Sequence, residues 1–159
     1  MIYWAIKAAQ DSKYVHDVFV STEDIEIETI SCKYEATVIK RPQQLSDDSV
    51  EKMDAICHAA KYITEEYKKP TIIVSLQANS PQVNASHIDQ GIGHLIKYKR
   101  VEVMSVDAEL NQDAAIRVMT YDTVFRKTLS VNFGVFVADI LDVHDERDVI
   151  YLENNYTRS

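Results

Sequence analysis

Short apolar runs alternate with helix-periodic segments along this chain, and this alternation restricts the fold more than any other feature. The clearest helical pattern covers residues 50–63, and a continuous apolar run over residues 71–76 follows it. An apolar run of that length is typical of a strand that is buried on both faces. The alternation predicts βαβ units, and therefore an α/β fold: a three-layer α/β/α sandwich with a mostly parallel, Rossmann-like sheet.

The same patterns predict the remaining elements. Further helices are expected over residues 2–12, 23–34, 86–96 and 145–154, and further strands over 18–20, 36–39, 101–106, 115–119 and 129–137. Ser21 or Thr22 would cap the second helix, because short polar side chains accept hydrogen bonds from first-turn N–H groups. Asn84 or Ser86 would start the helix after the 71–76 strand. Gly134 interrupts the last strand and marks a bulge or a close approach of backbone.

Length and charge exclude several classes of protein. With 159 residues, the chain is expected to form a single domain over residues 1–159. The formal net charge of -8 argues against nucleic acid as a partner, because phosphate backbones are bound by clustered Lys and Arg. No stretch reaches the ~18 apolar residues of a membrane span, so no membrane partner is expected. Two cysteines without C-x-x-C spacing, and the absence of a signal-peptide layout, predict a cytoplasmic protein.

Three polar segments are candidates for a ligand site: residues 41–49, 77–81 and 142–148. The first two directly follow predicted strands. In an open α/β sheet, ligands gather at the carboxyl ends of the strands. We therefore expect the chemistry of the chain to reside in these segments.

Four segments, in order along the chain, carry a resemblance to a known family. Residues 18–24 resemble its strand and turn "VVVSTDD", and residues 41–47 resemble its arginine–proline segment. Residues 76–81 resemble its loop "LQPTSP", and residues 141–148 resemble its "DIDTEED" segment. The sequence thus resembles the acylneuraminate (CMP-sialic acid synthetase-like) cytidylyltransferases over roughly its whole length. The resemblance implies their nucleotide-diphospho-sugar transferase fold.

The resemblance also implies an activity. The family transfers CMP from CTP to the anomeric hydroxyl of an acidic sugar such as a sialic acid, and releases pyrophosphate. Magnesium neutralises the triphosphate and the charge that develops in the transition state. The implied partners are therefore CTP, an acidic nine-carbon-type sugar and Mg²⁺, with a homodimer by analogy.

Individual residues receive roles from the same resemblance. Arg41 matches the arginine that contacts the base, and Gln77 and Ser80 match a loop that touches the ribose and the sugar. Asp142 matches the first metal-binding carboxylate, and together with Gln77 it forms the predicted catalytic set. Asp47 is a ligand contact or a helix cap. The structural alternatives are a surface salt bridge for Arg41, turn-forming roles for Gln77 and Ser80, and an acidic cap on the last helix for Asp142 and Asp145.

The chain departs from the family pattern in three places. His144 stands where the second metal-binding carboxylate is expected, and imidazole is a poor magnesium ligand. With three glycines in total, the chain lacks the family's N-terminal glycine- and lysine-rich phosphate loop and the strand before it. The fold is therefore expected in a truncated form, with a gap in the sheet or an exposed edge. Residues 108–137 replace a longer insert and are expected to form a reduced dimerisation or substrate arm.

These departures leave alternatives open. The chain is a fragment of an enzyme, a non-catalytic pseudoenzyme or assembly subunit that keeps the fold, or one of two polypeptides that complete the sheet together. A relative that acts on another sugar, such as a Kdo-type cytidylyltransferase, is a further alternative. The "LQ-x-x-SP" loop favours the sialic acid branch over the Kdo branch.

Overall fold

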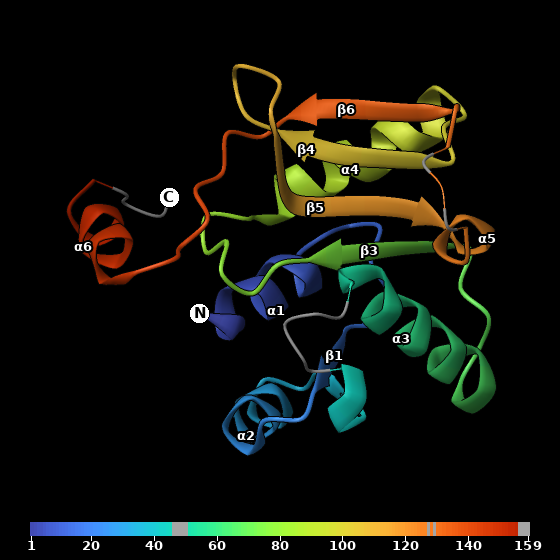
Figure 1. The fold of residues 1–159 in the computed structure, drawn as a ribbon, viewed down its shortest axis with the longest axis horizontal. Helices are drawn as coiled ribbons and strands as arrows, with labels where there is room; N and C mark the ends of the chain where they lie inside the picture. Colours follow the sequence, from blue (N-terminus) through green and yellow to red (C-terminus); the bar gives the residue numbers. More distant parts are fainter. Residues whose placement is uncertain (46–50, 127, 129, 156–159) are drawn as a thin grey trace.

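The computed structural model describes residues 1–45, 51–126, 128 and 130–155 (Figure 1). Its helices and strands follow one another in the order α1 (Ile2–Gln10), β1 (Phe19–Thr22), α2 (Ile25–Lys33), β2 (Thr37–Lys40), the 3₁₀ helix η1 (Gln43–Leu45), α3 (Lys52–Glu66), β3 (Ile72–Leu76), α4 (Ala85–Lys97), β4 (Glu102–Val106), β5 (Gln112–Thr120), α5 (Tyr121–Val124), β6 (Phe133–Val137) and α6 (Glu146–Asn155). The expected alternation of helices and strands is therefore present, with α5 as an unpredicted addition.

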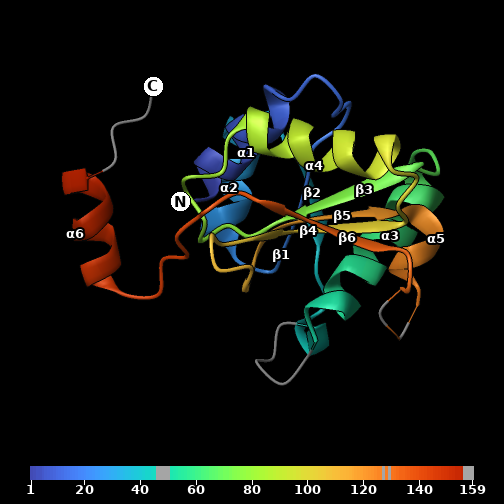
Figure 2. The same ribbon diagram turned by 90° about the horizontal axis from the view of Figure 1, so that it is seen from above.

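Helices cover both faces of the larger sheet. Figure 2 shows α1 and α4 on one side of the strands, and α3 and α5 on the other. The main hydrophobic cluster lies on the α4 side and includes Ile88, Ile92, Val103, Ile116 and Val118. A smaller cluster on the opposite side joins Ala60, Met119 and Val124. The expected α/β/α sandwich is confirmed.

Among the described residues the strands form two sheets rather than one. A two-stranded parallel sheet contains β1 and β2, and a four-stranded sheet has the order β3-β5-β4-β6. Within the larger sheet, β4 and β6 are parallel, whereas β5 is antiparallel to both of its neighbours. The division leaves one edge of β3 without a paired strand from the described ranges, which agrees with the expected gap or exposed edge.

The antiparallel direction of β5 was not predicted, because the expected βαβ units give a mostly parallel sheet. A tight hairpin turn joins β4 to β5 instead. The carboxylate of Asp107 accepts hydrogen bonds from the backbone N–H of Asn111 at 2.8 Å and from its side-chain amide at 3.0 Å. These hydrogen bonds hold the pKa of Asp107 below its ordinary value, and the bond from the Asn111 side chain has the largest effect. Leu110 completes the turn at φ 68°, so the chain reverses without a helix.

The expectation that the 71–76 strand is buried on both faces is wrong. All five residues of β3 are only half-buried, whereas all five residues of β4 are buried. The difference follows from position, because β4 lies between two strands and β3 lies at an edge. The sequence of β3, Ile-Ile-Val-Ser-Leu, has none of the charges or prolines that commonly protect a strand edge.

Local signals for helix starts were partly correct. Asn84 caps α4 by accepting from the N–H of His87 at 3.1 Å, as expected. The cap of α2 is Asp24 rather than Ser21 or Thr22, and its carboxylate accepts from two first-turn N–H groups. The hydroxyl of Thr22 instead accepts from the N–H of Asp24 at 3.1 Å, which orients the cap.

Two expectations were stated for Gly134, a bulge or a close approach. The close approach is confirmed. A methyl group at this position would lie 3.1 Å from Nε2 of His94. The strand itself is regular there, since Gly134 pairs in register with Val103. The irregularity of this sheet lies between β4 and β5 instead, at Met104 and Val106.

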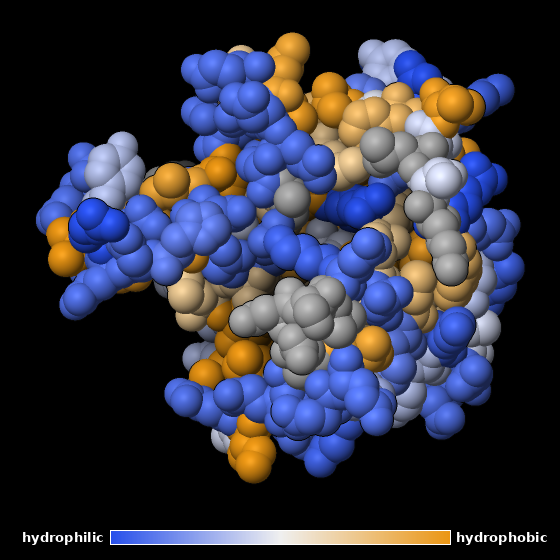
Figure 3. Space-filling model, in the orientation of Figure 1, coloured by the Kyte–Doolittle hydropathy of each residue, from blue (hydrophilic) through white to orange (hydrophobic). Residues whose placement is uncertain are grey.

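The C-terminal helix α6 stands apart from the layered body in both ribbon views. It lies beyond the carboxyl ends of β4 and β6 (Figure 1). In the same orientation, Figure 3 shows this part of the chain projecting from a largely hydrophilic face. None of the helices in the described part of the chain has both the length and the apolar character that a membrane crossing requires.

Candidate active site

The loop after β3 brings two of the expected site residues into contact. Gln77 continues the ladder beyond the strand, because its N–H donates to the carbonyl oxygen of Ala115 at 3.1 Å. Ser80 is 1% exposed, and its hydroxyl donates a hydrogen bond to Oδ1 of Asp142. A buried hydroxyl needs a partner, and an ionised acceptor makes the stronger bond. Ser80 and Asp142, both assigned from the sequence, therefore meet in one place.

Additional hydrogen bonds fasten the same two segments together. The backbone N–H of Val143 donates to the carbonyl oxygen of Asn79 at 2.8 Å, and the Asn79 amide donates back to the Val143 carbonyl at 3.3 Å. The side-chain oxygen of Gln82 accepts from the N–H of Leu141 at 2.7 Å. Because these bonds flank the Ser80–Asp142 contact, they fix Asp142 over the carboxyl end of β3.

Lys52 extends this cluster to the start of α3. Its Nζ donates to Oε1 of Gln77 at 3.2 Å. The amide of Gln77 therefore lies between the loop that holds Asp142 and a cationic side chain from a different element. Gln77, Ser80 and Asp142 thus form one hydrogen-bonded group with Lys52 at its margin.

Arg41 follows β2 and is held by a carboxylate. Its Nη2 lies 2.6 Å and its Nε 2.7 Å from Oε2 of Glu23, and the two side chains are 26% and 31% exposed. The N–H of Arg41 also donates to the carbonyl oxygen of Thr22 at 3.0 Å, so β1 positions the residue. The structural alternative considered for Arg41, a surface salt bridge, is therefore what the structure shows. Asp47 lies outside the described residues.

Two carboxylates of the segment after Asp142 accept hydrogen bonds near the start of α6. Asp145 accepts from the N–H of Arg147 at 2.8 Å and caps α6, and the hydrogen bond from the Arg147 guanidinium lowers its pKa. Asp148 accepts from the N–H of His144 at 2.8 Å. Across the described ranges, no group of three or more His, Cys, Asp or Glu side chains is placed to hold a metal. The acidic-cap alternative thus applies to Asp145, while Asp142 contacts Ser80.

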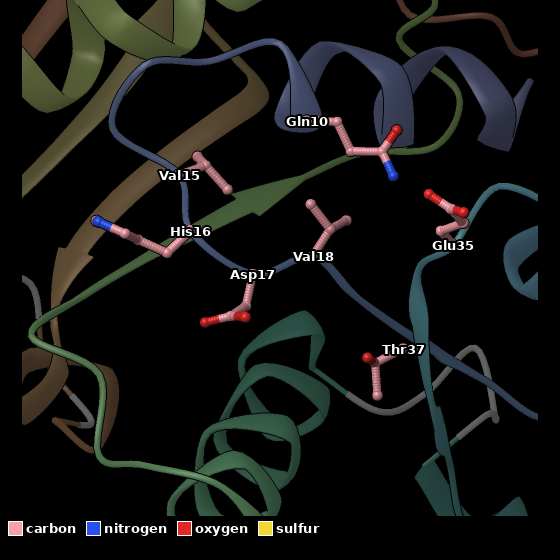
Figure 4. Close-up of a pocket in the computed structure, with 7 residues that line it drawn as sticks. All are labelled: Gln10, Val15, His16, Asp17, Val18, Glu35 and Thr37. Atoms are coloured by element: carbon pink, nitrogen blue, oxygen red, sulfur yellow. The ribbon is translucent and has the colours of Figure 1, made fainter.

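A separate hollow lies at the opposite ends of β1 and β2 (Figure 4). Its volume is about 210 Å³, and it is lined by Gln10, Val15, His16, Asp17, Val18, Glu35 and Thr37. These residues precede β1 and β2 or begin β2, so the hollow lies at the amino ends of the strands and contains none of the expected site residues. Two carboxylates in its wall disfavour a triphosphate, because like charges repel.

Four contributors to the site were missed from the sequence alone. The sequence patterns assigned no site role to Glu23 or to Lys52. Asn79 and Gln82 lie within or beside the "LQ-x-x-SP" loop but received no role. The signal for the last two was present, since a polar loop that is packed against another segment needs partners for its amides.

The chain is similar in sequence to known proteins. Residues 1–133 match a family model described as cytidylyltransferase. N-acylneuraminate cytidylyltransferase A of Danio rerio is 30% identical over 106 residues, and N-acylneuraminate cytidylyltransferase of Oncorhynchus mykiss is 31% identical over 106 residues. In each case the match covers 67% of this chain, and it spans only about a quarter (24%) of the relative's length.

Solved structures share the fold. A CMP:2-keto-3-deoxy-manno-octonic acid synthetase complexed with CTP matches with a TM-score of 0.72 at 10% identity, over 96% of this chain and 86% of that protein. A cytidylyltransferase from Leptospira borgpetersenii matches with a TM-score of 0.70 at 13% identity, over 99% of this chain and 76% of that protein. These likenesses confirm the expected sugar-nucleotidyltransferase type of sandwich.

Proposed function

The chain belongs to the cytidylyltransferase family, and from this membership we propose that it binds CTP at the carboxyl ends of β1, β2 and β3. We further propose that it transfers CMP to an acidic sugar of the sialic acid type. The observation that carries the proposal is the hydrogen bond from Ser80 to Asp142. It unites two segments that the sequence had assigned independently to the same site.

In this proposal the anomeric hydroxyl oxygen of the sugar attacks the α-phosphorus of CTP. The bond from the α-phosphorus to the oxygen that bridges to the β-phosphorus breaks, pyrophosphate leaves, and the hydroxyl proton passes to solvent. Gln77 and Ser80 border the ribose and the sugar, because a side-chain amide can both donate and accept. Arg41 turns from Glu23 to the cytosine, whose carbonyl edge suits a planar guanidinium.

Asp142 is the residue that would hold magnesium. The chemistry of the donors fits, since Mg²⁺ in nucleotide sites is often held by one or two carboxylates, with substrate phosphates and water as further ligands. Only Oδ1 of Asp142 is used by Ser80, so Oδ2 can serve as the ligand. When bound, the ion would supply positive charge to the triphosphate and to the leaving pyrophosphate.

Two alternatives have specific support. The ion pair that occupies Arg41, together with His144 in place of a carboxylate, favours a chain that keeps the fold without turnover. The likeness to a CMP:2-keto-3-deoxy-manno-octonic acid synthetase favours an eight-carbon acidic sugar, but at 10% identity it supports the fold more than the sugar. A homodimer, the single-domain boundaries, a 108–137 arm and a cytoplasmic location stay predictions.

Calorimetric titration of the purified chain with CTP and MgCl₂ tests the proposal, with UTP and ATP as matched competitors. We expect CTP to bind more tightly than either, and pyrophosphate to be released when a sialic acid is added. Pyrophosphate release with Kdo but not with sialic acid would transfer the assignment to the Kdo type. CTP binding without release for any acidic sugar would support the non-catalytic alternative. A folded chain that binds no nucleotide would overturn the proposal.

A further inference from the structure

Lys52 is connected to Asp142 by an unbroken series of contacts. Its Nζ donates to the side-chain oxygen of Gln77 at 3.2 Å, and the backbone N–H of Ser80 donates to the carbonyl oxygen of Gln77 at 3.4 Å. The Ser80 hydroxyl then donates to Asp142. A cation and a carboxylate therefore lie on the two sides of one short loop, at the carboxyl end of β3.

The charge of Lys52 is not neutralised by its partner. Arg41 is paired with the carboxylate of Glu23, and Lys40 lies 3.6 Å from the carboxylate of Glu28. Lys52 contacts a neutral amide instead, and an ammonium group has three donors, of which this contact uses one. Among the described residues around the carboxyl ends of β2 and β3, Lys52 thus keeps both its full charge and donors for a ligand.

Its place in the fold adds to this positive potential. Lys52 is the first residue of α3, a helix of 15 residues, and Glu51 before it makes no side-chain cap. The backbone of Lys52 therefore lies at the positive end of the helix dipole, in a first turn that also contains Asp54. Sequence patterns did not single out Lys52, because it lies away from the apolar stripe of its helix and resembles an ordinary solvent-exposed residue.

We propose that Lys52 binds the phosphate groups of the nucleotide. The inference rests on the proposed function, and deepens it by naming the group that recognises the triphosphate. Binding of the phosphates would draw the ammonium group from the Gln77 side-chain oxygen. Lys52 acts as a binding residue and takes no proton.

The experiment compares Lys52→Gln with Lys61→Gln, a lysine of the same helix that lies nine residues further from its start. Both variants remove one positive charge, so any difference between them reports position rather than net charge. Each protein is titrated with CTP, CMP and cytidine in the presence of MgCl₂. We expect Lys52→Gln to weaken CTP binding about tenfold, to weaken CMP less, and to leave cytidine unchanged. Lys61→Gln should bind all three as the unaltered chain does, and Lys52→Arg should retain most of the CTP affinity.

Several results would overturn this inference. Equal CTP binding by Lys52→Gln and the unaltered chain would show that the ammonium group does not contact the phosphates. An equal loss for CTP and cytidine would show that Lys52 acts only by orienting Gln77. If the unaltered chain binds no CTP, the proposed function fails and this inference fails with it, whereas the first two results leave the proposed function intact.

Discussion

Ser80 donates a hydrogen bond from its hydroxyl group to Oδ1 of Asp142, and so connects segments that are 62 residues apart. Both residues had been assigned to the site from separate sequence motifs. The paired hydrogen bonds between Asn79 and Val143 hold the same two segments together beside this contact. The contact gives Asp142 a defined position, which a residue needs before it can orient a metal ion and a substrate.

Replacing Asp142 by Asn should separate its charge from its structural role. The amide oxygen can still accept from Ser80, so the midpoint of thermal unfolding should change little. The affinity for CTP should fall about tenfold in MgCl₂ and little without it, because a neutral amide is a poor ligand for a hard cation. Isothermal titration calorimetry with and without MgCl₂ measures both values. Asp139→Asn is the matched control, since Asp139 is exposed and Asn tolerates its φ of 47°. An equal effect of the two substitutions would argue against a role for Asp142.

Glu23 should compete with CTP for Arg41. Glu23→Gln weakens the ion pair, which at its partial exposure stabilises by about 0.2–1 kcal/mol, so CTP affinity should rise by up to about fivefold. Arg41→Ala should lower CTP affinity about tenfold, because hydrogen bonds from a charged donor are lost. Fluorescence competition with CTP and UTP measures the two changes. If Arg41 has only the structural role of a surface salt bridge, both variants will bind CTP as the unaltered chain does.

The order of elements could be predicted from the sequence because it depends on local periodicity. The stripe on α3 and the apolar run of β3 both gave the correct element at nearly the correct residues. The neighbours of each strand could not be predicted in the same way. Whether β3 is central or at an edge depends on which strands pair with it, and no local pattern encodes that choice. The antiparallel β5 had a local signal, the Asp107–Asn111 turn, from which no hairpin was predicted.

The candidate site, like the fold, could be predicted from the sequence only in part. That Gln77, Ser80 and Asp142 lie close together could be anticipated, because each lies in a segment that resembles a family motif. Lys52 and Glu23 could not be anticipated, since their importance comes from contacts with residues 25 and 18 positions away. A long charged side chain can reach many partners, and only the three-dimensional structure shows which partner it has.

Two glycines of α4 should respond oppositely to alanine. A methyl group at Gly91 would lie 3.0 Å from Cε1 of Phe136 and 3.0 Å from Cγ2 of Val118, whereas at Gly93 it would meet nothing within 4 Å. Gly91→Ala should therefore destabilise the fold by about 1–2 kcal/mol through overpacking. Gly93→Ala should stabilise it by about 0.5–1 kcal/mol, because glycine is the poorer helix former. Urea unfolding of the two variants measures the change in the free energy of unfolding for each. Equal changes would contradict the packing of α4 on β5 and β6.

The stability of the fold should fall as the pH is lowered through the ordinary range of histidine, partly because of His87. Burial lowers the pKa of this imidazole, and the nearby Asp113 opposes the effect without cancelling it. His94, on the same helix, also has a lowered pKa, caused by burial and then by Arg100 and Lys97. The unfolded chain therefore takes up protons at a higher pH than the folded chain does. By linkage, stability is fully present above the unfolded pKa of about 6.5 and is lost as the pH falls toward the lower, folded value.

His87→Gln tests this assignment because glutamine keeps a polar side chain but does not titrate. The free energy of unfolding, measured by urea titration at intervals from about pH 8 to about pH 5, should decline less steeply in the variant than in the unaltered chain. The slope is informative even if the substitution shifts the absolute stability, since a packing defect is the same at every pH. His94→Gln should flatten the curve further when it is combined with His87→Gln. Parallel curves for the variant and the unaltered chain would show that His87 is as free to accept a proton in the folded protein as in the unfolded one.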